Sequence, residues 1–233
     1  AWQIFQAIEA DGGMMTALVD GKVHAMIETV RIARDTDIAR RKMPLIGVSE
    51  FPNLTEAPNK TLAMDVPKDW TTGEVAPAVT MLTCDRLQQH RLGEGFEALR
   101  DASDAFLEKS GSRPTVFLAT LGSPADFTVR ATWMSNLLAS GGIDVVTGSP
   151  QDLSASKATI ACICSSDALY ADEAEAAART LARHGAQHIL LAGKPGQMQD
   201  QLTAAGVQQF VHAGQNVLTL LGELSMLATG DAS

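Results

Sequence analysis

The stretch that decides the fold is RPTVFLATLGSPADFTVRATWMSNLLASGGIDVV, residues Arg113–Val146. Its first apolar run, Thr115–Leu121, is too short for a helix and rich in Val, Phe and Leu, so it predicts a buried strand. The residues Ser123-Pro124-Ala125-Asp126 have the cap, the first-turn proline and the acidic third position typical of a helix start. Ile143–Val146 then predicts a second strand. Together they predict a βαβ unit, with the loop at Gly122 on the carboxyl edge of a sheet, where ligands bind in open α/β folds.

The residues after this unit continue the alternation of short apolar runs and helical patterns. Further strands are expected at Thr159–Cys164, His188–Ala192 and Gln209–His212, and helices from Ser149, over Ala168–His184, over Pro195–Ala205 and over Asn216–Ala228. Five strands alternating with helices predict an α/β fold with a flavodoxin-like, doubly wound, five-stranded parallel sheet.

The first half of the chain lacks this alternation. Residues 1–49 are expected to be helical, with a break at Asp11-Gly12-Gly13 and a short strand candidate at Leu45–Val48. Prolines and small polar residues after residue 49 predict a linker that carries one helix, Cys84–Lys109. Because a structureless linker of that length is unusual inside a compact domain, we expect a domain boundary there. The predicted segments are 1–49, 50–112 and 113–233.

Composition and charge exclude several classes of protein. The chain has 233 residues, 45% of them apolar, and a formal net charge of −9 from 27 acidic and 18 basic residues. Such a chain can bury a substantial core, and its acidity speaks against a nucleic-acid-binding surface. Its apolar runs fall short of the roughly 18 residues that suggest a membrane span.

The N-terminus and the cysteines bear on processing and compartment. The start AWQIFQAIEA lacks the basic region and apolar core of a signal peptide, and it begins within a helical pattern without Met. We therefore expect a fragment or a processed piece of a longer protein.

Cys162 and Cys164 lie two apart in a predicted strand and match no metal or redox spacing, so buried thiols in the reducing cytoplasm are expected.

No catalytic constellation is evident at the predicted carboxyl ends of the strands. The loops there carry neither the glycine pattern of a dinucleotide site nor that of a P-loop. Ser165-Ser166 lacks a histidine base with an orienting acid, and Asp167 lacks the acidic pair of a phospho-accepting pocket. His184 and His188 fit structural roles at a helix end and a strand start, which leaves His212 as the one histidine near a strand end.

Several segments carry a resemblance to a known family. AWQIFQAIEADGGM and PLIGVSEF are similar to the close of the (β/α)8 barrel of methylmalonyl-CoA mutases. FEALRDASD followed by RPTVFLATLG is similar to the beginning of that family's cobalamin-binding domain. The order of parts, a barrel end, a long linker and a flavodoxin-like domain, also resembles the C-terminal end of these chains. The resemblance covers nearly the whole sequence.

The resemblance points to a cobalamin site whose residues this chain has lost. Members that bind cobalamin carry D-x-H-x-x-G after the first strand, where the His ligates cobalt and the Asp supports the His. The matching positions here are Pro124, Asp126 and Val129. The family's S-x-L after the third strand reads Ser165-Ser166-Asp167, and its Gly-Gly after the fourth strand reads Gly193-Lys194. The resemblance therefore implies no bound cofactor, no catalytic residue and no metal ligand in this chain.

Degenerate loops on a preserved scaffold resemble the non-catalytic small subunit of the heterodimeric bacterial mutase. There the large subunit binds adenosylcobalamin and converts methylmalonyl-CoA to succinyl-CoA. The resemblance implies that this chain is an isomerase subunit, inactive alone, which pairs with a large subunit and binds neither nucleic acid nor membrane.

Two alternatives stay open. The first is a cobalamin domain with a non-histidine binding mode that uses Asp126 or His212. The second is a stand-alone small-ligand or regulatory module. A well-formed cleft at the strand ends favours the module, whereas a crevice filled by Pro124, Phe127 or Lys194 favours the subunit.

Overall fold

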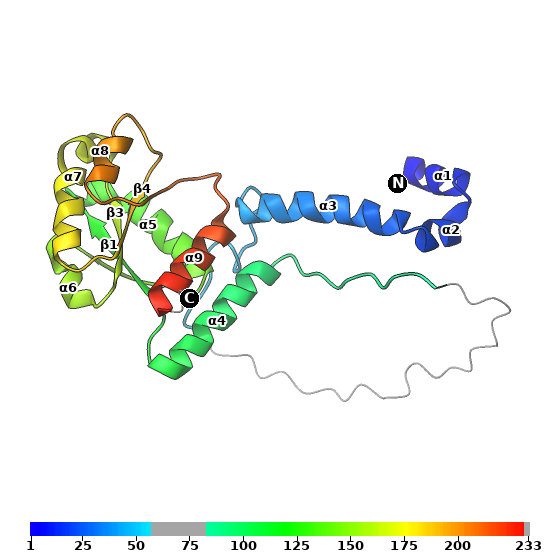
Figure 1. Cartoon of the computed structure of the whole chain (residues 1–233), viewed down its shortest axis with the longest axis horizontal. Helices are drawn as coiled ribbons and strands as arrows, with labels where there is room; N and C mark the ends of the chain where they lie inside the picture. Colours follow the sequence, from blue (N-terminus) through cyan, green and yellow to red (C-terminus); the bar gives the residue numbers. More distant parts are fainter. Residues whose placement is uncertain (57–82, 231–233) are drawn as a thin grey trace. The chain divides into compact units, whose positions relative to one another are not determined.

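The computed structural model describes residues 1–56 and 83–230 (Figure 1). The chain divides into two compact units, one formed by Ala1–Arg34 and Thr55–His90, the other by Asp35–Leu54 and Arg91–Ser233. These units do not coincide with the three predicted segments, whose boundaries stay a prediction. Residues of the predicted first segment and of the predicted linker join the unit of the sheet, because Leu45, Val48 and Phe96 pack into the sheet's core.

The second unit contains a five-stranded, all-parallel sheet. Its strands are β1 Thr115–Thr120, β2 Asp144–Gly148, β3 Ile160–Cys164, β4 His188–Ala192 and β5 Gln209–Val211. Their spatial order, β2-β1-β3-β4-β5, is that of the flavodoxin-like fold. The predicted fold class is therefore confirmed. The topological switch point lies between β1 and β3, where Val116 is aligned with Ile160.

Helices cover both faces of this sheet (Figure 1). The helices of the unit are α4 Glu94–Ser110, α5 Pro124–Ser140, η1 Pro150–Asp152, α6 Leu153–Ser156, α7 Asp167–Arg183, α8 Gln199–Ala204 and α9 Val217–Thr229. On one face α4, α5 and α9 pack with Val116 and Leu118 of β1. On the other, α6, α7 and α8 pack with Phe117 and Ala119. Because both faces of β1 are buried, its inner residues 116–119 are all apolar.

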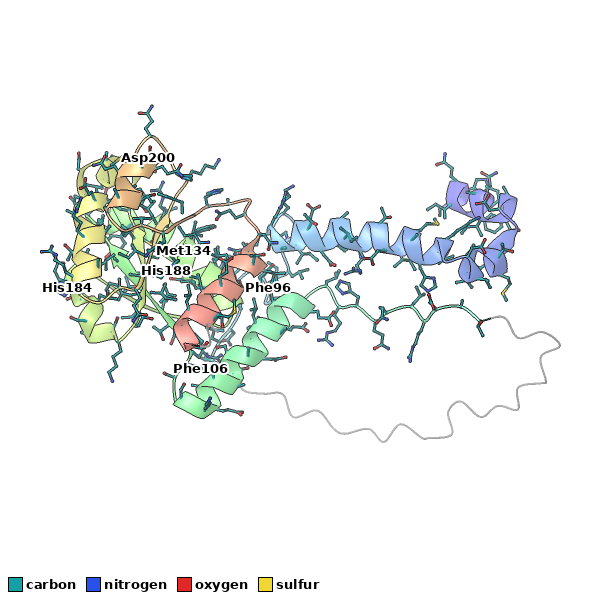
Figure 2. All side chains as sticks on the ribbon, viewed as in Figure 1. Phe96, Phe106, Met134, His184, His188 and Asp200 are labelled. Atoms are coloured by element: carbon teal, nitrogen blue, oxygen red, sulfur yellow. The ribbon has the colours of Figure 1, made fainter. Side chains whose placement is uncertain are left out.

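Helix α4 belongs to this unit through its packing on α9. Phe96 is fully buried in the core (Figure 2), and a Cβ added at Gly95 would lie 2.9 Å from Leu218 of α9. The predicted helix start at Cys84 is wrong. The residues before Gly93 are exposed, so no burial offsets the cost of ordering them into a helix.

The predicted strand at Leu45–Val48 is also wrong, as is the start of the helix predicted over Pro195–Ala205. Leu45–Val48 forms a turn rather than a strand, because the Leu45 N–H donates to the Ser49 hydroxyl and the Leu45 carbonyl accepts from the Ser49 N–H. Packing against the core, rather than strand pairing, explains its apolar residues. The helix predicted over Pro195–Ala205 begins only at Gln199, since Gly196 disfavours a helical backbone directly after the proline.

The first unit contains the predicted N-terminal helices, α1 Trp2–Ala10, α2 Gly13–Val19 and most of α3 Lys22–Ala39. Gly12, with φ of 100°, makes the predicted break between α1 and α2. Within the described part of this unit only Ala17 is buried. Six apolar side chains of these helices are at least half exposed: Trp2, Ile4, Phe5, Met15, Val30 and Ile32.

The proline-rich part of the predicted linker, residues 57–82, lies outside the described residues, as do residues 231–233. In the ranges 1–56 and 83–230, no helix has both the length and the apolar character needed to cross a membrane.

Candidate functional site

The loop between β1 and α5 is built around a helix cap. Gly122 ends the strand with φ of 77°, a left-handed conformation that favours glycine. The Asp126 carboxylate accepts hydrogen bonds from the Ser123 backbone N–H at 2.9 Å and from the Ser123 hydroxyl at 2.6 Å. These bonds hold the pKa of Asp126 below its usual range. The predicted helix start is confirmed, and the Asp126 carboxylate is occupied within its own turn.

The other two matched positions of this loop offer no ligand atom. Pro124 lies at the start of α5 and is exposed, and the Val129 side chain is 79% exposed. Neither side chain has a nitrogen or oxygen that could bind a metal. Throughout the described ranges, no group of three or more His, Cys, Asp or Glu side chains is arranged to hold a metal ion.

Side-chain hydrogen bonds tie the carboxyl ends of β1, β3 and β4 together. The hydroxyl of the fully buried Ser165 donates to the Leu121 carbonyl oxygen at 3.0 Å, across the switch point. The Tyr170 hydroxyl accepts from the Ser165 N–H at 3.0 Å and donates to the Ala192 carbonyl oxygen at 2.8 Å. Burial raises the pKa of the Tyr170 phenol well above its ordinary value. These two side chains satisfy backbone groups that the strand ends would otherwise leave open.

Arg130 crosses from α5 to the end of β3 and lies over Tyr170. Its guanidinium donates to the Ser165 carbonyl oxygen at 2.6 Å and to the Asp167 carboxylate at 2.5 Å. The guanidinium carbon lies 4.8 Å from the centroid of the Tyr170 ring, which is within cation–π range. A Cβ added at Gly193 would lie 3.8 Å from that carbon, so Arg130 also covers the end of β4. Burial opposes the charge, yet the bond to Asp167 leaves the pKa of Arg130 raised.

A pocket of about 220 Å³ lies beside this network, between α5 and the ends of β4 and β5. Its lining residues are Val129, Arg130, Trp133, Ala192, Gly193, Val211, His212 and Ala213. The walls are mostly apolar, and the ring Nδ1 of His212 lies 3.0 Å from the Ala213 carbonyl oxygen. The three side chains that were expected to fill the crevice in a subunit do not line this pocket. Pro124 and Lys194 are exposed, and Phe127 packs against the core instead.

The two side chains that do occupy the strand ends, Arg130 and Tyr170, were not predicted. They come from different helices, and the contacts that give them their role join residues up to 37 positions apart. One feature of the sequence could have drawn attention to Tyr170. It is the only tyrosine of the chain and stands in the first turn of the helix after β3. Neither local pattern nor spacing places Arg130 over it.

The side chains weighed for catalysis have structural roles. The Ser166 hydroxyl caps α7 by accepting a hydrogen bond from a backbone N–H in its first turn. His184 is the C-cap residue of that helix and His188 begins β4, as predicted. Cys162 and Cys164 are free, buried and packed on the same face of β3, also as predicted. Burial raises the pKa of the Cys162 thiol, which makes it a poor nucleophile.

Sequence comparisons agree on one family. A profile of the family described as methylmalonyl-CoA mutase matches residues 1–110. The chain is 39% identical over 229 residues to the methylmalonyl-CoA mutase small subunit of Streptomyces virginiae, covering 95% of this chain and 34% of that protein. It is 31% identical to the small subunit of Porphyromonas gingivalis, covering 95% of this chain and 35% of that protein. The chain thus spans about a third of the length of the curated relatives it matches.

A solved structure of a CheY-like protein, tadZ from Pseudomonas aeruginosa PAO1, overlaps 49% of this chain and 93% of its own chain. The sequence identity is 19% and the TM-score 0.36. Because this TM-score is low, the fold is assigned from the strand order of the sheet and not from this likeness.

Proposed function

We propose that this chain, which is similar over 95% of its length to methylmalonyl-CoA mutase small subunits, is the C-terminal part of a non-catalytic small subunit in a heterodimeric, adenosylcobalamin-dependent mutase. In this proposal the large subunit binds the cofactor and converts methylmalonyl-CoA to succinyl-CoA in the cytoplasm. This chain supports the large subunit structurally and is inactive alone. The observation that carries the proposal is that Arg130 and Tyr170 bind the carboxyl ends of β3 and β4, in a chain similar over 95% of its length to small subunits.

The residues at this edge do not fit a cobalamin. Asp126 is bonded within its own turn, and Pro124 and Val129 have no donor atom on their side chains. The side chains of Arg130 and Tyr170 bind the backbone groups at the ends of β3 and β4. We therefore assign no cofactor contact to this chain and derive no chemical step from it.

The exposed apolar side chains of α1–α3 support a role in assembly. Trp2 and Phe5 stack with ring centroids 5.3 Å apart, yet they are 68% and 51% exposed. Clustered apolar exposure of this kind is typical of an interaction surface. Since Ala17 is the one buried residue in the described part of that unit, its helices have almost no core of their own. In the proposed subunit this surface is covered by other parts of the mutase.

The alternative of a small-ligand module has one observation in its favour, the pocket beside Arg130. Its volume of about 220 Å³ lies below the range of roughly 300–1,000 Å³ that is usual for ligand sites. For the non-histidine cobalamin mode, His212 is the remaining candidate because Asp126 is already bonded. The small volume of the pocket and the hydrogen-bonded Asp126 both make the subunit the better supported function.

The test of the proposal is retention of the purified chain by a tagged large subunit of a methylmalonyl-CoA mutase. We expect retention that survives gel filtration as a single complex. A double variant, Trp2→Ser with Phe5→Ser, should weaken retention by tenfold or more, because burying each large apolar side chain contributes about 1.5–3 kcal/mol.

The matched control is Met226→Ser, which removes a 51% exposed apolar side chain from α9 in the other unit. This control should bind like the wild type. Failure of the folded wild-type chain to be retained would contradict the subunit proposal. Equal loss in the double variant and in the control would contradict the assignment of the surface to α1.

A further inference from the structure

Three side chains from α5 and α7 lie over the carboxyl ends of β1, β3 and β4. Leu169 covers Gly122 so closely that a Cβ added there would lie 2.3 Å from its Cδ1. Tyr170, 6% exposed, spans the ends of β3 and β4 with its hydroxyl. Arg130 lies over the Tyr170 ring and keeps only 25% of its side chain in solvent.

We propose that Arg130, Leu169 and Tyr170 form a built-in plug that closes this crevice in place of a ligand. The carboxyl edge at the switch point is where open α/β folds bind their ligands. Here it is filled by the chain itself, with an apolar group against the glycine loop and polar groups against the strand ends. The pocket of about 220 Å³ beside Arg130 is the part of the crevice that the plug leaves open.

The hydrogen bonds of the plug occupy the backbone atoms that a ligand at this edge would contact. The Ser165 carbonyl oxygen accepts from Arg130 at 2.6 Å and the Ala192 carbonyl oxygen accepts from Tyr170 at 2.8 Å. The Ser165 N–H donates to the Tyr170 hydroxyl at 3.0 Å. An incoming ligand would have to replace each of these bonds, because a buried group left without a partner is unfavourable.

Asp167 orients the plug rather than supplying its stability. Its carboxylate is 2.5 Å from the Arg130 guanidinium but its side chain is 88% exposed. Exposed ion pairs contribute little free energy, since water and salt screen them. The pair therefore acts by holding the guanidinium in the position where it also reaches the Ser165 carbonyl oxygen.

The plug rests on the proposed function in one respect: a closed crevice is expected in a subunit whose partner, the large subunit, binds the corrinoid. The two ideas fail separately. Retention by a large subunit tests the subunit assignment, whereas access of a small apolar probe to the strand ends tests the plug.

The experiment is an NMR titration of the isotope-labelled full chain with indole, comparing the wild type with Arg130→Ala. Removing the guanidinium should open a cavity that is continuous with the pocket. We expect Arg130→Ala to bind indole at least tenfold more tightly than the wild type, with the largest amide shifts at Ser165, Ala192 and Gly193.

Arg113→Ala is the matched control. Arg113 is also a mostly buried arginine, paired with Asp104 at 2.5 Å and bonded to the Ser103 hydroxyl and the Leu54 carbonyl oxygen. It precedes β1 and so lies at the opposite edge of the sheet. Its variant should bind indole like the wild type. Equal indole affinity of the wild type and Arg130→Ala would overturn the plug.

If Arg130→Ala does not fold, Tyr170→Phe keeps the proposal testable. This variant retains the ring but removes the hydroxyl that accepts from the Ser165 N–H. Hydrogen exchange of the Ser165 amide should then accelerate at least tenfold, while the Ala161 amide in the middle of β3 keeps its protection. Unchanged exchange at Ser165 would refute the plug.

Discussion

The Tyr170 hydroxyl offers the sharpest test of how the carboxyl edge is held together. It accepts from the Ser165 N–H and donates to the Ala192 carbonyl oxygen, and both of these residues are buried. Replacing Tyr170 by Phe keeps the ring and its contact with Arg130 while it deletes both hydrogen bonds. The substitution therefore measures the polar part of the contact apart from its packing.

The expected loss follows from two buried backbone groups left without partners. Each such group costs about 1–3 kcal/mol, so Tyr170→Phe should lower the free energy of unfolding by about 2–6 kcal/mol. With a urea dependence of about 2 kcal/mol per molar, the unfolding midpoint should fall by about 1–3 M. Circular dichroism at increasing urea concentration measures that midpoint directly.

The matched control is Thr180→Val, which removes a hydroxyl that donates to the Ala176 carbonyl oxygen at 2.8 Å on the exposed side of α7. Because water can replace that bond, the control should change stability by less than about 0.5 kcal/mol. An equally small effect of Tyr170→Phe would refute the hydrogen-bond network as the element that joins β3 and β4.

Three further predictions concern the same unit. Phe96→Ala should lower the free energy of unfolding by about 3–5 kcal/mol in a urea titration, because this buried side chain anchors α4 in the core; a loss below about 1 kcal/mol would show that α4 is not part of the cooperative unit. Gly122→Ala should lower the thermal midpoint, since φ is 77° and the new Cβ would meet Leu169; an unchanged midpoint would contradict the close contact. Above about pH 10 the wild type should lose stability more steeply than Tyr170→Phe. Burial raises the pKa of Tyr170 in the folded state, so at this pH the phenol ionises in the unfolded chain while it stays protonated in the folded chain, and the free energy of unfolding falls as the pH rises. Parallel pH profiles of the two proteins would contradict this.

Local sequence patterns predicted the sheet well because the physics behind them is local. Both faces of β1 are covered, so its inner residues had to be apolar without interruption, and Gly122 with Ser123 and Asp126 had to punctuate the strand and start the helix. One element start that was predicted wrongly is set by tertiary packing. Helix α4 begins near Phe96 because that side chain enters the core, and no pattern around Cys84 contains this information.

The sequence predicted which residues stand at the matched loop positions, but not what lies over the strand ends. Pro124, Asp126 and Val129 stand where the resemblance would place the cobalamin motif, and the structure places Asp126 in the cap of α5. What occupies the crevice instead depends on Arg130 and Tyr170 meeting across two helices. That meeting is a property of the folded chain, because neither residue belongs to a motif or a recognisable spacing.

The proposed subunit has a flavodoxin-like sheet whose ligand edge is closed by its own side chains. The measurement that tests this closed edge most directly is a visible-absorbance titration of the purified chain with adenosylcobalamin, followed by desalting. The account predicts an unchanged cofactor spectrum and complete separation of corrin from protein. Corrin retained with a red-shifted, histidine-type spectrum would contradict the closed edge, and retention with an unshifted spectrum would establish the alternative, non-histidine mode of binding.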